Sequence, residues 1–135
     1  MTISNPIALR RVLYLNALFS ATSGVVLIAA AAPLGQLFGG VTPWLLRALG
    51  AGLLGFAADI ALACRRRGLA RGKALYFSLA DFAWVAGSVA LLVLVPLATA
   101  ARLLVAAVML VVLAFGLAQW RLIARDRTDQ AHAQG

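Results

Sequence analysis

The amino-acid sequence predicts an all-α, polytopic membrane protein built as a four-helix transmembrane bundle, and three observations support this fold class. First, 64% of the 135 residues are hydrophobic and the mean hydropathy is +0.97, which is more apolar surface than a soluble domain of this size can bury. Second, the chain contains four apolar runs of about 20 residues, the length that crosses the hydrocarbon core. Third, the cations gather at the ends of these runs. We therefore expect the lipid bilayer to be the solvent of this chain.

The first two predicted spans form a hairpin. Arg10 and Arg11 precede an apolar run over residues 12–32, which is longer than the hydrophobic region of a signal peptide and is therefore interpreted as a span. A loop with Pro33, several glycines and no charge follows it, as is typical of a short connection. The second span covers residues 44–64 and ends at the most basic stretch of the chain.

The last two predicted spans form a second hairpin. The third span covers residues 74–95 and ends before Pro96, which cannot continue a helix easily. The fourth span covers residues 102–123. Residues 1–125 are thus predicted to form a single transmembrane domain, and residues 126–135 a polar C-terminal tail.

The distribution of cations predicts the orientation. Five cations lie within residues 64–73, and such a loop stays on the cytoplasmic side by the positive-inside rule. Ten of the twelve Lys and Arg residues are then cytoplasmic, which leaves only Arg47 and Arg102 near the outer ends of spans two and four. We expect a multi-pass protein of the bacterial inner membrane with both termini in the cytoplasm. Each outer arginine either extends to the interface or forms an outer anion site.

Composition also limits the function classes. The net charge of +8 is explained by topology and by contact with anionic lipid headgroups, so the lipid bilayer is the expected partner and nucleic acid is not. Cys64 is the only cysteine and His132, in the tail, the only histidine. A histidine-based haem or metal site within the spans is therefore not expected, and neither is another cofactor. The sequence holds no Ser/His/Asp or Cys/His set that favours an enzyme.

Polar residues inside the spans are the candidate functional residues, because ionisable groups in a bilayer are costly. Counted from the basic ends at 1.5 Å per residue, Asn16, Asp59 and Asp81 lie about 7, 8 and 11 Å deep. We expect these three side chains to converge in one cluster, with Ser88 on the stripe of Asp81 further along span three. Gln119 lies so near the inner boundary that it is interpreted as interfacial.

Two interpretations of this cluster stay open. In the structural one, Asp59 pairs with an arginine such as Arg66 or Arg11, while Asp81 accepts hydrogen bonds from Asn16. In the functional one, a desolvated carboxylate exchanges protons or binds a small cation, and Asp81 is the better candidate because it lies deeper.

A glycine-rich run in the second span predicts helix packing. Residues 50–55 spell G-x-G-x-x-G, but inside a transmembrane helix this pattern favours close helix approach over dinucleotide binding. Ala51, Gly52 and Gly55 are the predicted packing residues. Ala51, Gly55 and Asp59 share one stripe, which we expect to face the other helices.

Three segments carry a resemblance. Asn16 through Gly24, Leu46 through Gly50, and Asp81 through Ser88 together resemble a group of short four-helix bacterial inner-membrane proteins of unassigned activity. The resemblance implies a fold and no activity. In size alone the chain is similar to the small multidrug resistance transporters, but those depend on a glutamate in their first helix. This sequence contains no glutamate and has Asn16 in the corresponding region.

Two functions follow as hypotheses. The first is a non-enzymatic role in helix–helix association, either as a homo-oligomer or as an accessory subunit of a membrane complex, through the Gly/Ala stripe. The alternative is a small proton- or cation-coupled transporter that uses Asp81, with Asn16 and Ser88 on the path.

Overall fold

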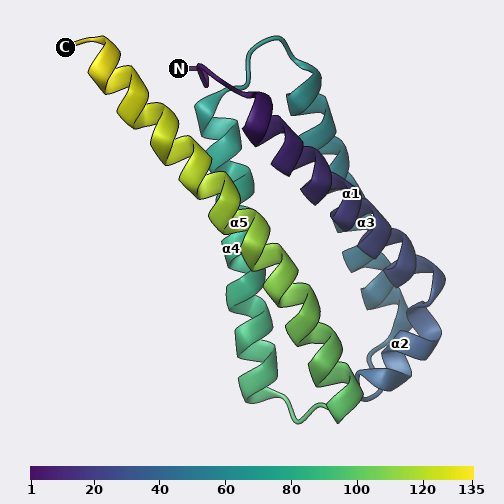
Figure 1. The fold of residues 1–135 in the computed structure, drawn as a ribbon. Helices are drawn as coiled ribbons and strands as arrows, with labels where there is room; N and C mark the ends of the chain where they lie inside the picture. Colours follow the sequence, from purple (N-terminus) through teal and green to yellow (C-terminus); the bar gives the residue numbers. More distant parts are fainter.

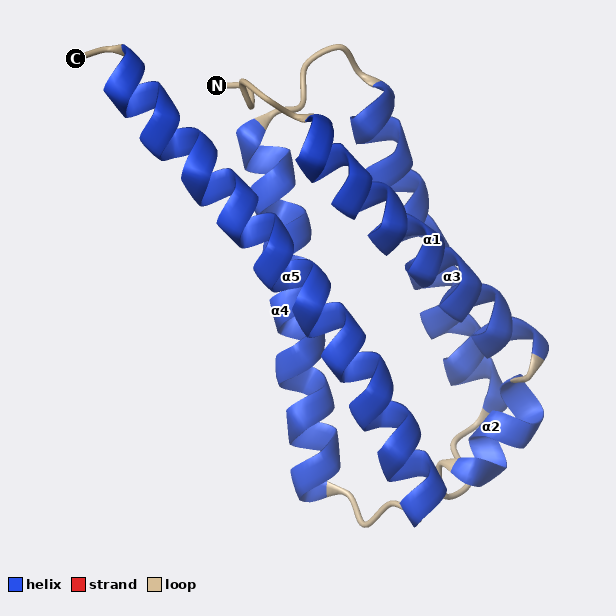
Figure 2. Cartoon of the chain, viewed as in Figure 1, coloured by secondary structure: helices blue, strands red, loops and turns tan.

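The computed structural model describes all 135 residues and is entirely helical, with no strands (Figure 2). Four of its five helices are long and apolar enough to cross a membrane, which confirms the predicted all-helical chain with four candidate spans. In chain order the helices are α1 (Ile7–Ala29), α2 (Ala31–Leu37), α3 (Pro43–Arg65), α4 (Arg71–Leu94) and α5 (Thr99–Ala133). All except α2 are candidate spans.

The four long helices pack as two hairpins (Figure 1). α1 lies along α3, α4 lies along α5, and the hairpins meet mainly where α1 contacts α5. α3 and α4 meet near the basic turn that joins them, where the rings of Phe56 and Phe77 have their centroids 5.8 Å apart. Both termini lie at the same end of the bundle as this basic turn.

The close packing of α1 on α3 depends on two glycines. A Cβ atom at Gly24 would lie 2.7 Å from the carbonyl oxygen of Gly50, and a Cβ at Gly50 would lie 2.6 Å from the carbonyl oxygen of Gly24. No side chain fits at either position without moving a backbone. This crossing is therefore a small-residue contact of the kind that lets membrane helices approach closely.

The helix boundaries differ from the predicted ones by up to five residues at most span ends, and two further segments that were predicted as non-helical form helix. The first half of the predicted outer loop forms α2, which packs against the start of α3 and ends in a turn where Gly39 and Gly40 have positive φ angles of 82° and 92°. At the other end, the predicted polar tail continues α5 as a helix to Ala133. Hydrogen bonds to the N-terminal segment hold this part of the helix in place. The sequence did not indicate a helix here, because a polar segment has no apolar stripe.

The N-terminal segment, residues 1–5, is attached to the basic end of the bundle. The backbone N–H of Ile3 donates to the carbonyl oxygen of Leu69 at 3.0 Å, and the N–H of Arg71 donates to the carbonyl of Met1 at 3.1 Å. Ser4 donates through both its backbone N–H and its hydroxyl to Asp126 on α5. The segment thereby links the turn between α3 and α4 to the C-terminal part of α5.

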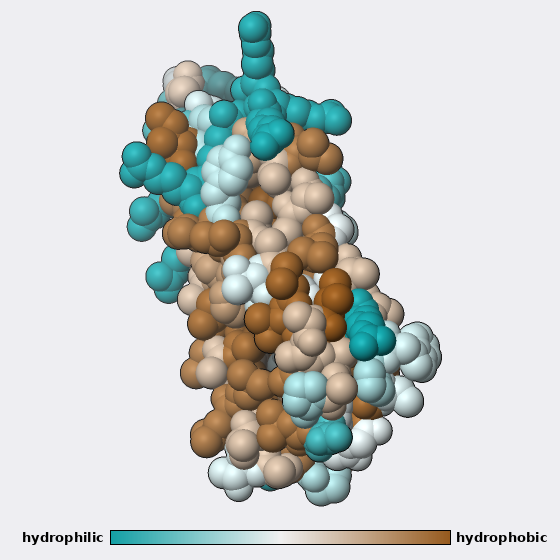
Figure 3. Space-filling model, turned by 90° about the vertical axis from the view of Figure 1, so that its right-hand side faces the viewer, coloured by the Kyte–Doolittle hydropathy of each residue, from teal (hydrophilic) through white to brown (hydrophobic).

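Most apolar side chains lie on the outside of the molecule. Only 26 of 135 residues are buried, and large side chains such as Leu94 and Trp44 are 78% and 67% exposed. The surface in Figure 3 is predominantly hydrophobic along the bundle and hydrophilic at the end that carries the chain termini. Contact of such an apolar surface with the hydrocarbon core of a bilayer is favourable, whereas its contact with water is not.

Candidate functional site

A hydrogen-bonded cluster of polar side chains lies where the two hairpins meet. The carboxylate of Asp81 on α4 accepts a hydrogen bond from Asn16 Nδ2 on α1 at 2.7 Å and another from Gln119 Nε2 on α5 at 2.7 Å. Both amides donate to the same oxygen, Oδ2, and no group of the chain donates to Oδ1. Asp81 is only 4% exposed, and its two partners are buried more completely. Three helices are thus joined at one carboxylate.

Helical spacing on α1 brings Asn16 into this cluster. Leu9, Leu13, Asn16 and Ser20 follow one another at intervals of three or four residues and are all buried, so they form the inward stripe of α1. Ser20 Oγ donates to Asn16 Oδ1 at 3.3 Å. This contact leaves the amide nitrogen of Asn16 free to donate to Asp81.

A glycine on α5, Gly116, allows Gln119 to reach the cluster. A Cβ at Gly116 would lie 3.1 Å from the Phe82 ring and 3.4 Å from Asp81 Cβ, so glycine allows α5 to approach α4 closely. The hydroxyl of Ser78 donates to the Gly116 carbonyl at 3.1 Å and fastens the two helices together. Gln119, one turn beyond Gly116, is then positioned over the carboxylate.

No positive charge of the chain neutralises Asp81. The only ion pair in the structure joins Lys73 to Asp59, and the partners of Asp81 are neutral amides. Burial in a low-dielectric interior destabilises a carboxylate unless hydrogen bonds, a proton or a cation compensate. The two amide donors compensate in part, and the carboxylate can also take up a proton or coordinate a cation.

Gln119 contributes a second acceptor without a partner. Its side chain is 0% exposed, and its Oε1 accepts no hydrogen bond. Buried polar atoms are nearly always hydrogen-bonded, so an exception calls for a water, an ion or a ligand. Asp81 Oδ1 and Gln119 Oε1 belong to two side chains that are hydrogen-bonded to each other. Both oxygens can accept a hydrogen bond or coordinate a cation.

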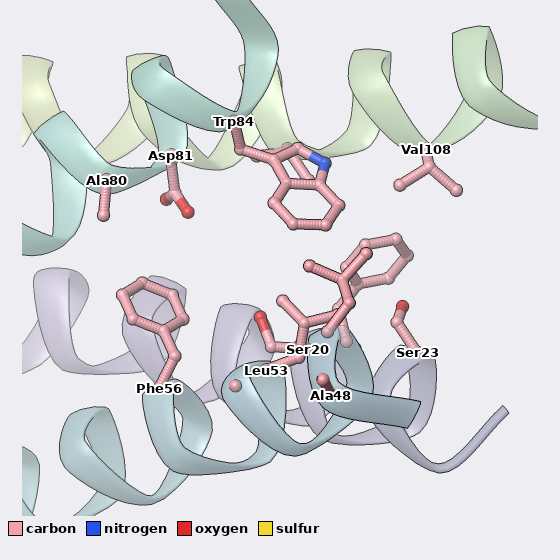
Figure 4. A pocket seen from close by; sticks show the side chains of 13 residues that line it. Ser20, Ser23, Ala48, Leu53, Phe56, Ala80, Asp81, Trp84 and Val108 are labelled. Atoms are coloured by element: carbon pink, nitrogen blue, oxygen red, sulfur yellow. The ribbon is translucent and has the colours of Figure 1, made fainter. Parts of the chain in front are cut away.

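A cleft of about 320 Å³ between the hairpins gives access to this cluster. Figure 4 shows Asp81 and Trp84 of α4 projecting toward Ser20 of α1 and toward Leu53 and Phe56 of α3. The walls are mainly apolar, and the polar lining consists of Asp81 and two serines. The lining residues are Phe19, Ser20, Ser23, Ala48, Leu49, Gly52, Leu53, Phe56, Ala80, Asp81, Trp84, Val108 and Val112.

Asp59 does not belong to the cluster, and its expected convergence with Asn16 and Asp81 is wrong. Its carboxylate pairs with Lys73 Nζ at 2.7 Å, and the two side chains are 38% and 45% exposed. The expected pairing of Asp59 with an arginine such as Arg66 or Arg11 is also wrong. The buried stripe of α3 contains residues such as Gly50, Ala57 and Ile60, so Asp59 lies off the stripe that meets α1.

Ser88 lies on the same helix as Asp81 but outside the hydrogen-bonded cluster. Its hydroxyl donates to the carbonyl of Trp84 at 2.9 Å, and it is half-buried. Seven residues separate it from Asp81, which places it about 10 Å further along the helix. The structure therefore joins Asn16 to Asp81 and leaves Ser88 apart.

The predicted packing residues are not packed within the chain. Ala51, Gly52 and Gly55 are exposed, and a Cβ at either glycine would meet nothing within 4 Å. Within the chain, Gly24 and Gly50 make the close helix contact instead. Gly52 lines the cleft between the hairpins, whereas Ala51 and Gly55 lie on the exposed surface of α3.

The two outer arginines are also separate from the cluster. Arg47 and Arg102 lie near the beginnings of α3 and α5, at the end of the bundle opposite the basic turn, and both are exposed. Neither forms an ion pair. Their long side chains can therefore reach an interface, as expected for cations near span ends.

Gln119 is the residue that sequence reasoning missed, and a signal for it exists. The buried residues of α5 recur at intervals of three or four, which is the spacing of one inward stripe. Gln119 is the polar member of this stripe that lies closest to the apolar run. The stripe contains Val112, Gly116, Gln119, Ile123 and Asp126.

The geometry thus shows a carboxylate held by two amides at the edge of an apolar cleft, in a chain with four candidate spans. Its interpretation depends on this geometry alone, because comparisons of the chain with models of protein families, with curated proteins and with solved structures find no match.

Proposed function

We propose that this small integral membrane protein is a transporter that binds a proton or a small cation at Asp81 and couples its passage to a change in the cleft between the hairpins. The observation that carries the proposal is the Asp81 carboxylate, which borders the cleft and has two neutral amide donors but no cation of the chain beside it. This activity converts no substrate into a product, so the protein is proposed not to be an enzyme.

The geometry supports a gating role for bound charge. Asn16 and Gln119 come from different hairpins and share the Oδ2 atom of Asp81. A proton or cation at the carboxylate weakens its attraction for these amide donors, because a hydrogen bond to an ionised acceptor is stronger than one to a neutral acceptor. Binding at Asp81 therefore loosens the contact between the hairpins.

A pair of aspartate variants tests this proposal. Asp81→Asn removes the titrating group inside the bundle, whereas Asp59→Asn alters a partly exposed ion pair outside the cluster. In sealed vesicles with an imposed pH gradient, the unmodified protein and Asp59→Asn should both give pH-dependent proton or cation flux, and Asp81→Asn should give none. Equal flux from both variants, or none from the unmodified protein, contradicts the proposal.

A second candidate function is helix–helix association as a homo-oligomer or as an accessory subunit of a membrane complex. The specific observation is the outer face of α3, where Ala51 and Gly55 are exposed and a Cβ at Gly55 would meet nothing within 4 Å. Such a face allows another helix to approach closely in a bilayer. A second copy of the same chain is the occupant that we propose.

Substitution of Gly55 by a larger residue tests this association. A Cβ at Gly55 would meet nothing within 4 Å in the chain, so Gly55→Leu adds bulk to the open face and should reduce the oligomer size measured in mild detergent by light scattering. Ala90→Leu on α4, also at an exposed position, is the matched control and should leave the size unchanged. An oligomer size that is equal in all three proteins argues against association through this face.

We further propose that the end with the basic turn and both termini faces the cytoplasm, in the inner membrane of a bacterium. The support is the concentration of Lys and Arg at this end, which is the pattern of cytoplasmic loops.

A further inference from the structure

A second cleft, of about 420 Å³, lies at the basic end of the molecule. It is bordered by the N-terminal segment, by the beginning of α4 and by the C-terminal part of α5, and it is separate from the cleft at Asp81. Its lining contains two arginines and no acidic residue. The lining residues are Met1, Arg71, Leu75, Arg127, Gln130, Ala131 and Gln134.

The two arginines bring positive charge to this cleft and form no ion pair within the chain. Neither Arg71 nor Arg127 has a carboxylate within ion-pair distance, since the only ion pair is elsewhere. The nearby carboxylate of Asp126 is already engaged, because Ser4 donates to its Oδ1 and Gln130 Nε2 donates to its Oδ2 at 3.0 Å. The guanidinium groups of Arg71 and Arg127 make no hydrogen bonds within the chain, so their donors are free for an anion.

The cleft lies at the level of lipid headgroups in the proposed orientation. Arg71 is the first residue of α4, directly before the apolar part of this helix. Leu75 and Leu79 follow it at intervals of four residues and therefore lie on the same face, and Leu79 is 57% exposed. On α5, Trp120 precedes Arg127 by two turns and is 47% exposed.

We propose that this cleft binds the phosphate of an acidic membrane lipid. Arginine binds phosphate oxygens through paired, charge-assisted hydrogen bonds, and Arg71 and Arg127 present such donors from two helices. The acyl chains of the lipid then lie over the exposed apolar side chains of α4 and α5, which begin just below the cations. A soluble phosphate shares the chemistry of the head but gains nothing from this apolar surface.

Lipid retention by paired charge variants tests the site. Protein in mild detergent is incubated with phosphatidylglycerol or with phosphatidylcholine of the same acyl chains, and bound lipids are counted by native mass spectrometry. The unmodified protein should retain phosphatidylglycerol preferentially. The double variant Arg71→Gln with Arg127→Gln should lose at least about tenfold in apparent affinity, since each ten-fold step corresponds to the loss of about one charge-assisted contact.

The matched control removes the same charge at the other end of the bundle. Arg47→Gln with Arg102→Gln should retain phosphatidylglycerol like the unmodified protein. Equal losses in the two double variants mean that net charge governs retention, and this result overturns the site. Folding is checked by circular dichroism, and the single variant Arg127→Gln repeats the test if the double variant does not fold.

A competition experiment separates a lipid from a soluble phosphate. Glycerol 3-phosphate offers the same anionic group without acyl chains, so at equal concentration it should displace little phosphatidylglycerol. Full displacement at that concentration overturns the lipid assignment and identifies the cleft as a site for a soluble phosphate compound.

Discussion

At the scale of single residues, the carboxylates of this chain differ in how their charge is neutralised. Asp59 has the ammonium group of Lys73 at 2.7 Å. Asp126 accepts from Ser4 beyond the apolar part of α5. Asp81 has only the amides of Asn16 and Gln119, and it is the only aspartate that lines the cleft between the hairpins.

A double-mutant cycle measures the contact between the hairpins. Asn16→Ala and Asp81→Ala should each destabilise the protein, and their coupling energy should be about 0.6 to 1.7 kcal/mol, the range of hydrogen bonds between membrane helices. The cycle of Asn16→Ala with Asp59→Ala is the control and should give a coupling energy near zero, because these residues are not in contact. Reversible unfolding in mixed micelles gives the free energies. Equal coupling in the two cycles contradicts the structure of the cluster.

The pKa of Asp126 predicts a pH dependence for the N-terminal attachment. Burial raises this pKa, but the hydrogen bonds from Ser4, together with the positive charge of Arg71, outweigh burial and lower it below its usual value. A lowered pKa stabilises the folded state above the pKa of the unfolded chain, about 3.9, and this stabilisation is lost as the pH falls through the folded-state pKa. The attachment should therefore be intact at neutral pH and weaken below about pH 4.

Hydrogen exchange tests this pH dependence. The Ile3 amide, bonded to Leu69, should lose protection on going from pH 5 to pH 3 in the unmodified protein. The Asp126→Asn variant has no titrating group at position 126. Its Ile3 amide should therefore show the same protection at pH 5 and pH 3, once the change in intrinsic exchange rate is subtracted. Parallel pH curves for the two proteins speak against a role for the Asp126 charge.

The sequence predicted the level of the polar residues along the bundle but not the direction in which their side chains point. Counting along the helices from the basic ends placed Asn16 and Asp81 at nearly one level, and the structure bonds them to each other. The same count placed Asp59 at that level and gave no information on which way its side chain points. The interfacial interpretation of Gln119 rests on its closeness to the predicted inner boundary, whereas the structure buries its side chain against Asp81.

At the scale of elements, α3 shows why helix faces were harder to predict than helix positions. The apolar run gave its bounds to within one residue, since the prediction was 44–64 and the helix is Pro43–Arg65. Small residues, however, occur all around α3, at Gly50 as well as at Gly52 and Gly55. Spacing cannot distinguish a face that meets α1 from one that meets lipid or a second chain, because both are apolar.

Alanine substitutions at these glycines distinguish the two faces. Gly50→Ala places a methyl group against the backbone of α1 and should lower the free energy of unfolding by about 1 to 3 kcal/mol, as overpacking does. Gly52→Ala meets no neighbour and should be neutral or raise it by up to about 1 kcal/mol through helix propensity. Unfolding in detergent, monitored by circular dichroism, gives both values. Similar effects of the two substitutions contradict the observed crossing.

At the scale of the whole molecule, the basic residues that end the spans also define one end of the bundle. The turn between α3 and α4 and both chain termini lie together (Figure 1), as four consecutive spans require. This end also contains Arg10, whose guanidinium donates to the carbonyl of Arg66 at 2.7 Å and to that of Arg67 at 3.2 Å. The four spans were predictable because their apolar runs match the bilayer thickness.

Introduced thiols test the proposed orientation. In a Cys64→Ala background, Arg66→Cys places a thiol in the basic turn and Arg102→Cys places one at the opposite end, and both positions are exposed. A membrane-impermeant maleimide added to intact cells should label the second variant and not the first. Permeabilised cells should show labelling of both, and labelling of the first variant in intact cells refutes the orientation.

The length of α5 has a mechanical consequence. Its 35 residues extend about 52 Å at 1.5 Å per residue, whereas the hydrocarbon core is about 30 Å thick. The helix is uninterrupted from Gln130, which donates to the Thr2 carbonyl at 3.3 Å, down to Gln119 at the intramembrane carboxylate. α5 is therefore one continuous rod that connects the attachment of the N-terminal segment to the hydrogen bond at Asp81.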